Sequence, residues 1–171
     1  MKNPTPGICA CLLSLLALVA VPAFADEPDA VLEQPGIGAG PALVVESNDG
    51  GRYWRLEDAG EQRAPAYPRS LVKAGIEGCV TVGYVIKPDG FPDAYRILRS
   101  RASLPSRNVA RQMAAALVQM IAQRRYVPGP ENPGRLPGFA AEYAVFGVGA
   151  GAQCRIDDLG AFMRAGAEGQ S

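Results

Sequence analysis

The chain has 171 residues, room for one ordinary domain with appendages, and its 17 basic and 17 acidic residues give a formal net charge of zero. It contains no histidine, so the commonest general base and the commonest metal ligand are both missing. We therefore predict that the protein is not an enzyme and that it uses no cofactor or metal. The charges are uneven: residues 26–61 carry nine acids and two bases, whereas residues 63–125 carry eleven bases and three acids.

Residues 1–25 are predicted to be a cleavable signal peptide. Lys2 gives a positive start, residues 8–21 form an apolar run, and Ala23-Phe24-Ala25 fits the small-x-small cleavage pattern. The apolar run is shorter than the roughly 20 residues of a membrane-spanning helix. We therefore expect cleavage after Ala25, a periplasmic location and no membrane span after the signal is removed.

Residues 26–63 are predicted to form an acidic arm. Residues 26–40 are rich in proline, glycine and acids and show no hydrophobic period. Two β-prone runs, residues 42–46 and 52–56, flank a turn-forming Asn-Asp-Gly-Gly, which predicts a small hairpin. Trp54, the only tryptophan, is expected to anchor this hairpin to the main domain.

The main domain is predicted in residues 64–150. A short helix at residues 69–74 leads into an alternating apolar strand at residues 78–90, which ends in a Pro-Asp-Gly turn. Residues 94–99 form a second strand, paired with the first as a hairpin.

The second half of the domain begins with an amphipathic helix. Ser106 is a suitable N-cap, and apolar residues recur at helical spacing from Val109 to Ile121. A proline-rich loop then leads to a third strand at residues 139–148. A short helix at residues 157–164 is expected within a C-terminal tail, residues 151–171.

Four of the 171 residues are cysteines, and two of them lie in the predicted signal peptide. The remaining pair is Cys79 and Cys154. Two cysteines in an exported protein favour a disulfide over a metal site, which would need further ligands at short spacing.

Four short motifs resemble, in their order and spacing, the TonB C-terminal domain family. They are Pro65-x-Tyr67-Pro68, Glu77-Gly78-x-Val80-x-Val82, Asp89-Gly90 and Arg125-Tyr126-Val127-Pro128. The resemblance implies an α+β fold of ββαβ order, with a three-stranded antiparallel sheet and one long helix packed on it. The family usually has an aromatic residue where Arg124 stands. In this fold the end of the third strand lies near the start of the first, which supports a Cys79–Cys154 disulfide.

The resemblance also implies a mode of binding. In TonB itself, the domain binds a short peptide of an outer-membrane receptor by strand addition beside the third strand. The implied partner here is a protein of the bacterial envelope, such as an outer-membrane receptor peptide, and not a nucleic acid. The partner-binding residues predicted on this strand are Phe139, Ala141, Tyr143, Ala144, Val145 and Phe146. The strand has no proline or lysine and only one charge, at Glu142, to block its edge. A proline at Ala144 is expected to abolish capture if that N–H faces outward.

Other functions stay open at this point. The edge could be sealed by the hairpin of residues 42–56 or by a second copy in a homodimer, which would make this a structural domain of an envelope assembly without receptor-peptide binding. A partner could instead bind a basic face formed by Arg96, Arg107 and Arg111. A pocket with convergent polar groups would favour an enzyme or a small-molecule carrier. Because a cleavable signal stands in place of the family's membrane anchor, direct force transmission from the inner membrane is not expected.

Overall fold

The computed structural model describes residues 43–57, 64–148 and 153–168. The predicted signal peptide and the first part of the acidic arm lie outside these residues. Among the helices that are described, none is both long enough and apolar enough to cross a membrane.

Strand β3 (Gly78–Ile86) is one of the two inner strands of a four-stranded sheet with the order β1-β6-β3-β4. β4 (Pro92–Ala102) pairs with it as the predicted hairpin, and β6 (Gly138–Phe146) lies antiparallel on its other side. The hairpin turn requires Gly90, which has a φ of 86° and packs against the backbone of Tyr126. The fourth strand, β1 (Leu43–Val45), lies in the β-prone run predicted at residues 42–46, but it pairs in parallel with β6 and not with residues 52–56.

The predicted N-terminal hairpin is wrong. Its first half is β1, whereas its second half, β2 (Trp54–Leu56), pairs antiparallel with β5 (Tyr126–Pro128) in a separate two-stranded sheet. Trp54 explains the difference, because its side chain is 2% exposed and its indole N–H donates to the carbonyl of Leu136 at 3.0 Å. Trp54 therefore has the predicted anchoring role. Its burial in the main core places β2 beside β5 and not beside β1.

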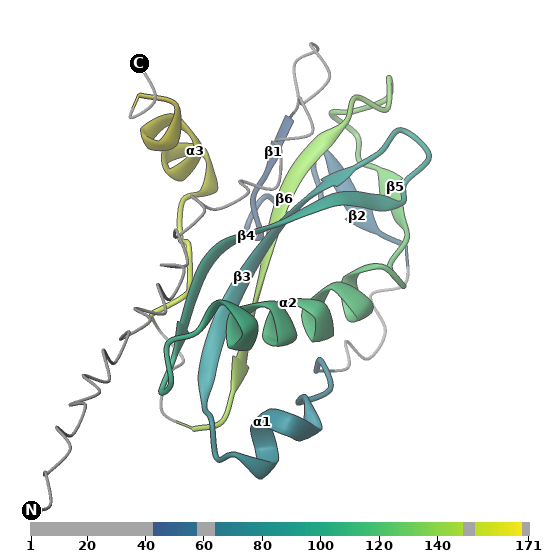
Figure 1. The fold of residues 1–171 in the computed structure, drawn as a ribbon. Helices are drawn as coiled ribbons and strands as arrows, with labels where there is room; N and C mark the ends of the chain where they lie inside the picture. Colours follow the sequence, from purple (N-terminus) through teal and green to yellow (C-terminus); the bar gives the residue numbers. More distant parts are fainter. Residues whose placement is uncertain (1–42, 58–63, 149–152, 169–171) are drawn as a thin grey trace, which may run out of the picture. The chain divides into compact units, whose positions relative to one another are not determined.

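Helix α2 (Arg107–Ile121) lies across one face of the four-stranded sheet (Figure 1). Its apolar stripe packs against the alternating residues of β3, as the two periodicities require. The buried residues of this interface are Val109, Met113, Leu117 and Ile121 from α2 with Val80, Val82, Tyr84 and Ile86 from β3. The short helix α1 (Arg69–Lys73) precedes β3, close to its predicted bounds. Ser106 is the N-cap residue of α2, although its side chain makes no capping hydrogen bond.

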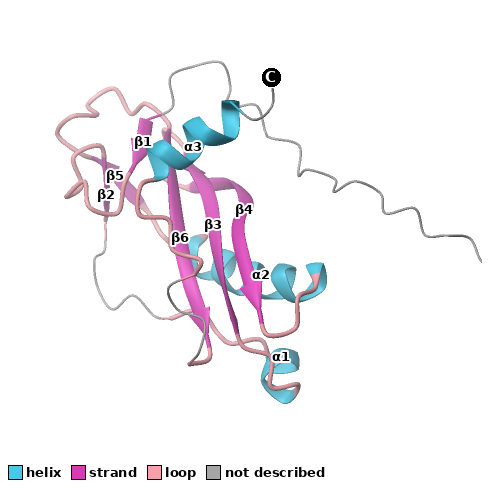
Figure 2. Cartoon of the chain, turned by 90° about the vertical axis from the view of Figure 1, so that its left-hand side faces the viewer, coloured by secondary structure: helices cyan, strands magenta, loops and turns pink. Residues whose placement is uncertain are grey.

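The opposite face of the sheet is covered by the C-terminal segment, residues 153–168. Figure 2 shows this segment crossing the strands on the side away from α2 and ending in α3 (Leu159–Glu168). The predicted disulfide joins Cys79 to Cys154, with a Cα–Cα distance of 5.8 Å, and the Thr81 hydroxyl donates to the carbonyl of Cys154. Both faces of β3 are therefore buried. The predicted short helix in a tail is corrected to a longer helix in a segment that forms part of the domain.

Candidate functional site

The outer edge of β6 is covered at its start and open after it. Three consecutive pairs, from Leu43 opposite Gly138 to Val45 opposite Ala140, join β1 to β6. Beyond Ala140, no described residue pairs with the outer side of β6. We call the outer side of residues 141–146 the open edge. The sequence left open whether this edge is free or sealed. Among the described residues, it is paired along residues 138–140 and unpaired beyond them.

The hydrogen bonds at the start of β6 decide which backbone groups face outward. The N–H of Leu43 donates to the carbonyl of Pro137 at 2.9 Å, so Pro137 presents its carbonyl to β1. Because successive residues of a strand direct their backbone groups to alternate sides, Tyr143 and Val145 face outward. Ala144 faces β3, where its register partner is Val80. The proline test at Ala144 required an N–H that faces outward, whereas the N–H of Ala144 faces β3. Tyr143 is therefore the position at which a proline tests the edge.

The side chains of the six predicted partner-binding residues fall into two groups. Tyr143 and Val145 are 42% and 38% exposed, and Ala141 is half-buried. The other three, Phe139, Ala144 and Phe146, are buried. Only Tyr143 and Val145 therefore present both an outward backbone and an exposed side chain.

Arg155 lies beside the open edge and was not predicted. Its guanidinium carbon is 5.9 Å from the centroid of the Tyr143 ring, and its Nε is 2.9 Å from a carboxylate oxygen of Asp157. The disulfide at the preceding residue holds this part of the chain on the sheet. The sequence signal for this placement was the pairing of Cys154 with Cys79.

The three arginines predicted as a basic face do not form one cluster, although Arg96 and Arg111 both line a small pocket of about 210 Å³ between β4 and α2. Arg96 lies on the side of the sheet away from α2, with its guanidinium 4.6 Å from the centroid of the Phe139 ring and 3.0 Å from the sulfur of Met163. Burial there lowers the pKa of Arg96. Arg107 and Arg111 belong to α2, on the other side of the sheet.

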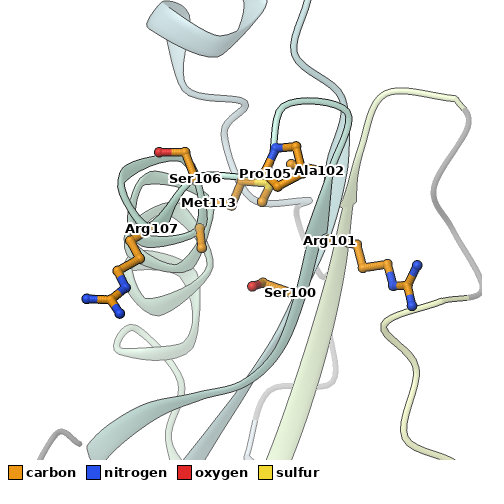
Figure 3. Close-up of a pocket in the computed structure, with 8 residues that line it drawn as sticks. Ser100, Arg101, Ala102, Pro105, Ser106, Arg107 and Met113 are labelled. Atoms are coloured by element: carbon orange, nitrogen blue, oxygen red, sulfur yellow. The ribbon is translucent and has the colours of Figure 1, made fainter. Parts of the chain in front are cut away.

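A pocket of about 410 Å³ lies between the start of α2 and the end of β4. Figure 3 shows that Arg107 points away from it and that Arg101 points to the other side of the sheet. Ser100, Ser106 and Met113 remain near its walls. This pocket does not gather the convergent polar groups that a small-molecule site would need.

A second pocket, of about 450 Å³, lies next to the open edge on the α2 side of the sheet. We call it the edge pocket. Glu142, the single charge of the edge, lies in its wall and pairs with Arg124 at 2.7 Å. The Tyr84 and Tyr126 hydroxyls are 2.7 Å apart in the same wall, and burial raises the pKa of Tyr84 well above its ordinary value. Arg124 thus neutralises the single charge of β6.

The opposite edge of the sheet, on β4, is less regular than the edge of β6. The register of β4 with β3 shifts at two points, Ala94 has a φ of 53°, and the strand begins at Pro92. Bulges and prolines of this kind hinder the addition of another strand. β6 shows no register shift along its pairing with β3. The open edge of β6 is therefore the better template.

Together these features define a small α+β domain in which a helix covers one face of a sheet and one strand edge is partly open. Residues 63–138 match the family model described as the Gram-negative bacterial TonB protein C-terminal. The predicted resemblance to the TonB C-terminal domain family is confirmed over these residues. The match ends at Gly138, so the remainder of β6 and the C-terminal segment lie outside it.

The solved structures similar to this chain include two TonB C-terminal domains. The TonB C-terminal domain of Pseudomonas aeruginosa is 25% identical, with a TM-score of 0.45, and the alignment covers 66% of this chain and 97% of that one. The TonB C-terminal domain of Helicobacter pylori is 19% identical, with a TM-score of 0.37, and the alignment covers 50% of this chain and 70% of that one. No curated protein matches the chain.

Proposed function

We propose that this protein is a periplasmic protein–protein interaction module of the TonB C-terminal type, which binds an envelope partner by strand addition to the open edge of β6. One observation carries the proposal. β1 pairs with only three residues of β6, so the backbone groups of Tyr143 and Val145 face outward with no partner among the described residues. Such groups are a template for another strand.

The chemistry of the edge suits an extended peptide. Main-chain hydrogen bonds to Tyr143 and Val145 would supply affinity, and contacts with alternate side chains would supply specificity. Both exposed side chains lie on the face that the C-terminal segment covers, with Arg155 beside Tyr143. A segment of an envelope protein, such as the periplasmic peptide of an outer-membrane receptor, is the partner class that we assign, and TonB-related transport is the process.

Export is part of the same proposal. It is supported by the signal-peptide pattern of residues 1–25 and by the disulfide, which an oxidising compartment maintains. Mass measurement of the exported protein is expected to show cleavage after Ala25. A mature protein that keeps residues 1–25 and fractionates with the inner membrane would contradict export by cleavage.

Site-specific photo-crosslinking tests the binding surface. We would place a photoreactive amino acid at Val145 in one variant and at Val72 in a matched control. Val72 is also an exposed valine, 55% exposed against 38% for Val145, but it lies on α1. Irradiation of cells is expected to give envelope-protein adducts from position 145 and none from position 72. Equal adducts from both positions, or adducts from position 72 alone, would place the binding surface elsewhere.

A further inference from the structure

The edge pocket opens where a strand added to β6 would begin. Ala140, Ala141 and Glu142 line it, and so do Val45 and Glu46 at the end of β1. Tyr84 and Glu142 lie on the α2 side of the sheet, because their register partners are Ala140 and Val82. An added strand directs every second side chain to this side of the sheet. The side chain nearest the end of β1 is therefore within reach of the pocket.

The charged groups of the pocket are not equally available to a ligand. Glu142 is paired with Arg124, and Glu46 accepts hydrogen bonds from the N–H groups of Leu159 and Gly160, at 3.2 and 2.9 Å. Both carboxylates therefore already have partners within the protein. The remaining carboxylate of the pocket belongs to Asp49.

Asp49 has an acceptor that the fold leaves unused. Its Oδ1 accepts a hydrogen bond from the N–H of Gly51 at 2.7 Å, whereas its Oδ2 is buried and has no partner. A buried carboxylate oxygen without a donor is costly, so a donor that reaches Oδ2 by displacing the atoms that cover it would relieve that cost.

The rest of the pocket favours a cation as that donor. Its lining residues include three acidic and two basic ones, and the basic residue outside the Arg124–Glu142 pair is the exposed Arg55, whose charge water and salt screen. Arg52, which is not among the lining residues, also interacts electrostatically with Asp49, but it is exposed and its guanidinium is paired with Glu131 at 2.8 Å. Trp54, Tyr84 and Tyr126 also line the pocket. Trp54 and Tyr84 are each only 2% exposed, so the half-buried Tyr126 is the ring most accessible to a lysine or arginine side chain and its aliphatic stem.

We propose that the edge pocket binds a lysine or arginine side chain of the strand added to β6, with the carboxylate of Asp49 as its acceptor. This inference rests on the proposed function, since it assigns one side chain of the peptide bound there. It makes the pocket a specificity site next to the main-chain contacts.

The probe for this inference is a phage-displayed library of random twelve-residue peptides, selected on the full oxidised chain. Four proteins are compared: the wild type, Asp49→Asn, Asp93→Asn and Tyr143→Pro. Asp93 is the matched control, because its Oδ1 also accepts from a nearby backbone N–H, that of Ala94 at 2.8 Å, but it does not line the edge pocket. Thermal unfolding of each variant checks that it is folded.

We expect the wild type and Asp93→Asn to enrich peptides with a lysine or arginine at one fixed position. Asp49→Asn should weaken the binding of such a peptide by roughly tenfold to a hundredfold, the worth of one charge-assisted hydrogen bond. Replacing the basic residue of the peptide by norleucine should cause the same loss in the wild type and no further loss in Asp49→Asn.

The outcomes separate this inference from the proposed function. Peptides that lose binding to Tyr143→Pro, but that carry no enriched basic residue or bind Asp49→Asn equally well, would overturn the edge-pocket assignment alone. Peptides that bind Tyr143→Pro as well as the wild type would overturn strand addition, and with it this inference. A selection that enriches no peptide at all would count against both.

Discussion

Replacing Tyr143 with proline tests the direction in which β6 presents its backbone, without any knowledge of the partner. The N–H of Tyr143 faces the outer side of the sheet, so a proline there removes no hydrogen bond of the four-stranded sheet. The N–H of the next residue, Ala144, faces β3, and its side chain is only 5% exposed. The two adjacent prolines should therefore differ strongly in their effect on stability.

The magnitudes follow from these surroundings. A proline at Ala144 leaves a carbonyl of β3 without its donor, which costs about 1–3 kcal/mol. The added ring overpacks a buried position, which costs about 1–3 kcal/mol more. We therefore expect Ala144→Pro to lower the free energy of unfolding by roughly 2–6 kcal/mol. For Tyr143 the reference is Tyr143→Ala, which loses the side chain but keeps the N–H, and the further loss from alanine to proline should be about 1 kcal/mol or less.

The assay is urea unfolding of the oxidised protein, followed by far-ultraviolet circular dichroism and extrapolated linearly to water. Each proline variant is compared with its own reference, Tyr143→Ala or the wild type. If the proline at Tyr143 costs as much as the proline at Ala144, the N–H of Tyr143 is bonded within the fold. The open edge, and the proposal of strand addition, would then be lost.

Three further predictions concern the rest of the domain. Replacing Cys79 and Cys154 together by serine should lower the free energy of unfolding by about 4 kcal/mol, because their sequence separation is 75 residues; alkylation of two free thiols in the unreduced wild type would contradict this. Trp54→Ala should cost about 3–5 kcal/mol in urea unfolding, because the side chain is 2% exposed, and a loss below about 1 kcal/mol would refute its anchoring role. Burial raises the pKa of Tyr84 well above 10.0, the ordinary value. The contribution of Tyr84 to the free energy of unfolding is therefore complete below about pH 10 and is lost as the pH rises further, because the unfolded chain then releases the proton that the folded state keeps. Tyr84→Phe should flatten this alkaline loss, measured as the free energy of unfolding against pH.

The strand and helix order of the main domain could be predicted because local patterns agree with it. Apolar residues alternate along β3, at Val80, Val82, Tyr84 and Ile86, and they recur with the helical period along α2. The sequence of each element therefore indicates which of its faces is buried. The N-terminal hairpin failed for a related reason. A turn sequence between two β-prone runs specifies a hairpin only when no stronger partner competes, and the burial of Trp54 in the main core outweighs three residues of local pairing.

The candidate site could be predicted as a strand with an outer edge, but the sequence did not show which of its residues face outward or how much of the edge is covered. The lack of proline and lysine in β6 is visible in the sequence. Which of its residues face outward depends on the register with β3 and on the hydrogen bond from Leu43 to Pro137. That register places Ala144 and Phe146 in the core and leaves Tyr143 and Val145 exposed. The edge pocket was also beyond prediction, since Asp49, Arg124 and Glu142 are far apart in the chain.

The sequence by itself determined the elements whose signals are local: the signal pattern, the β3–β4 hairpin with its glycine turn, the amphipathic helix, the third strand and the likeness to the TonB C-terminal family. Only the tertiary structure decided what covers each surface of those elements. It brought β1 to the edge of β6, laid the C-terminal segment over the second face of the sheet, and set Arg124 against Glu142. The physical reason is that periodicity encodes which face of an element is buried. The partner of that face is chosen by long-range packing, which no short stretch of sequence contains.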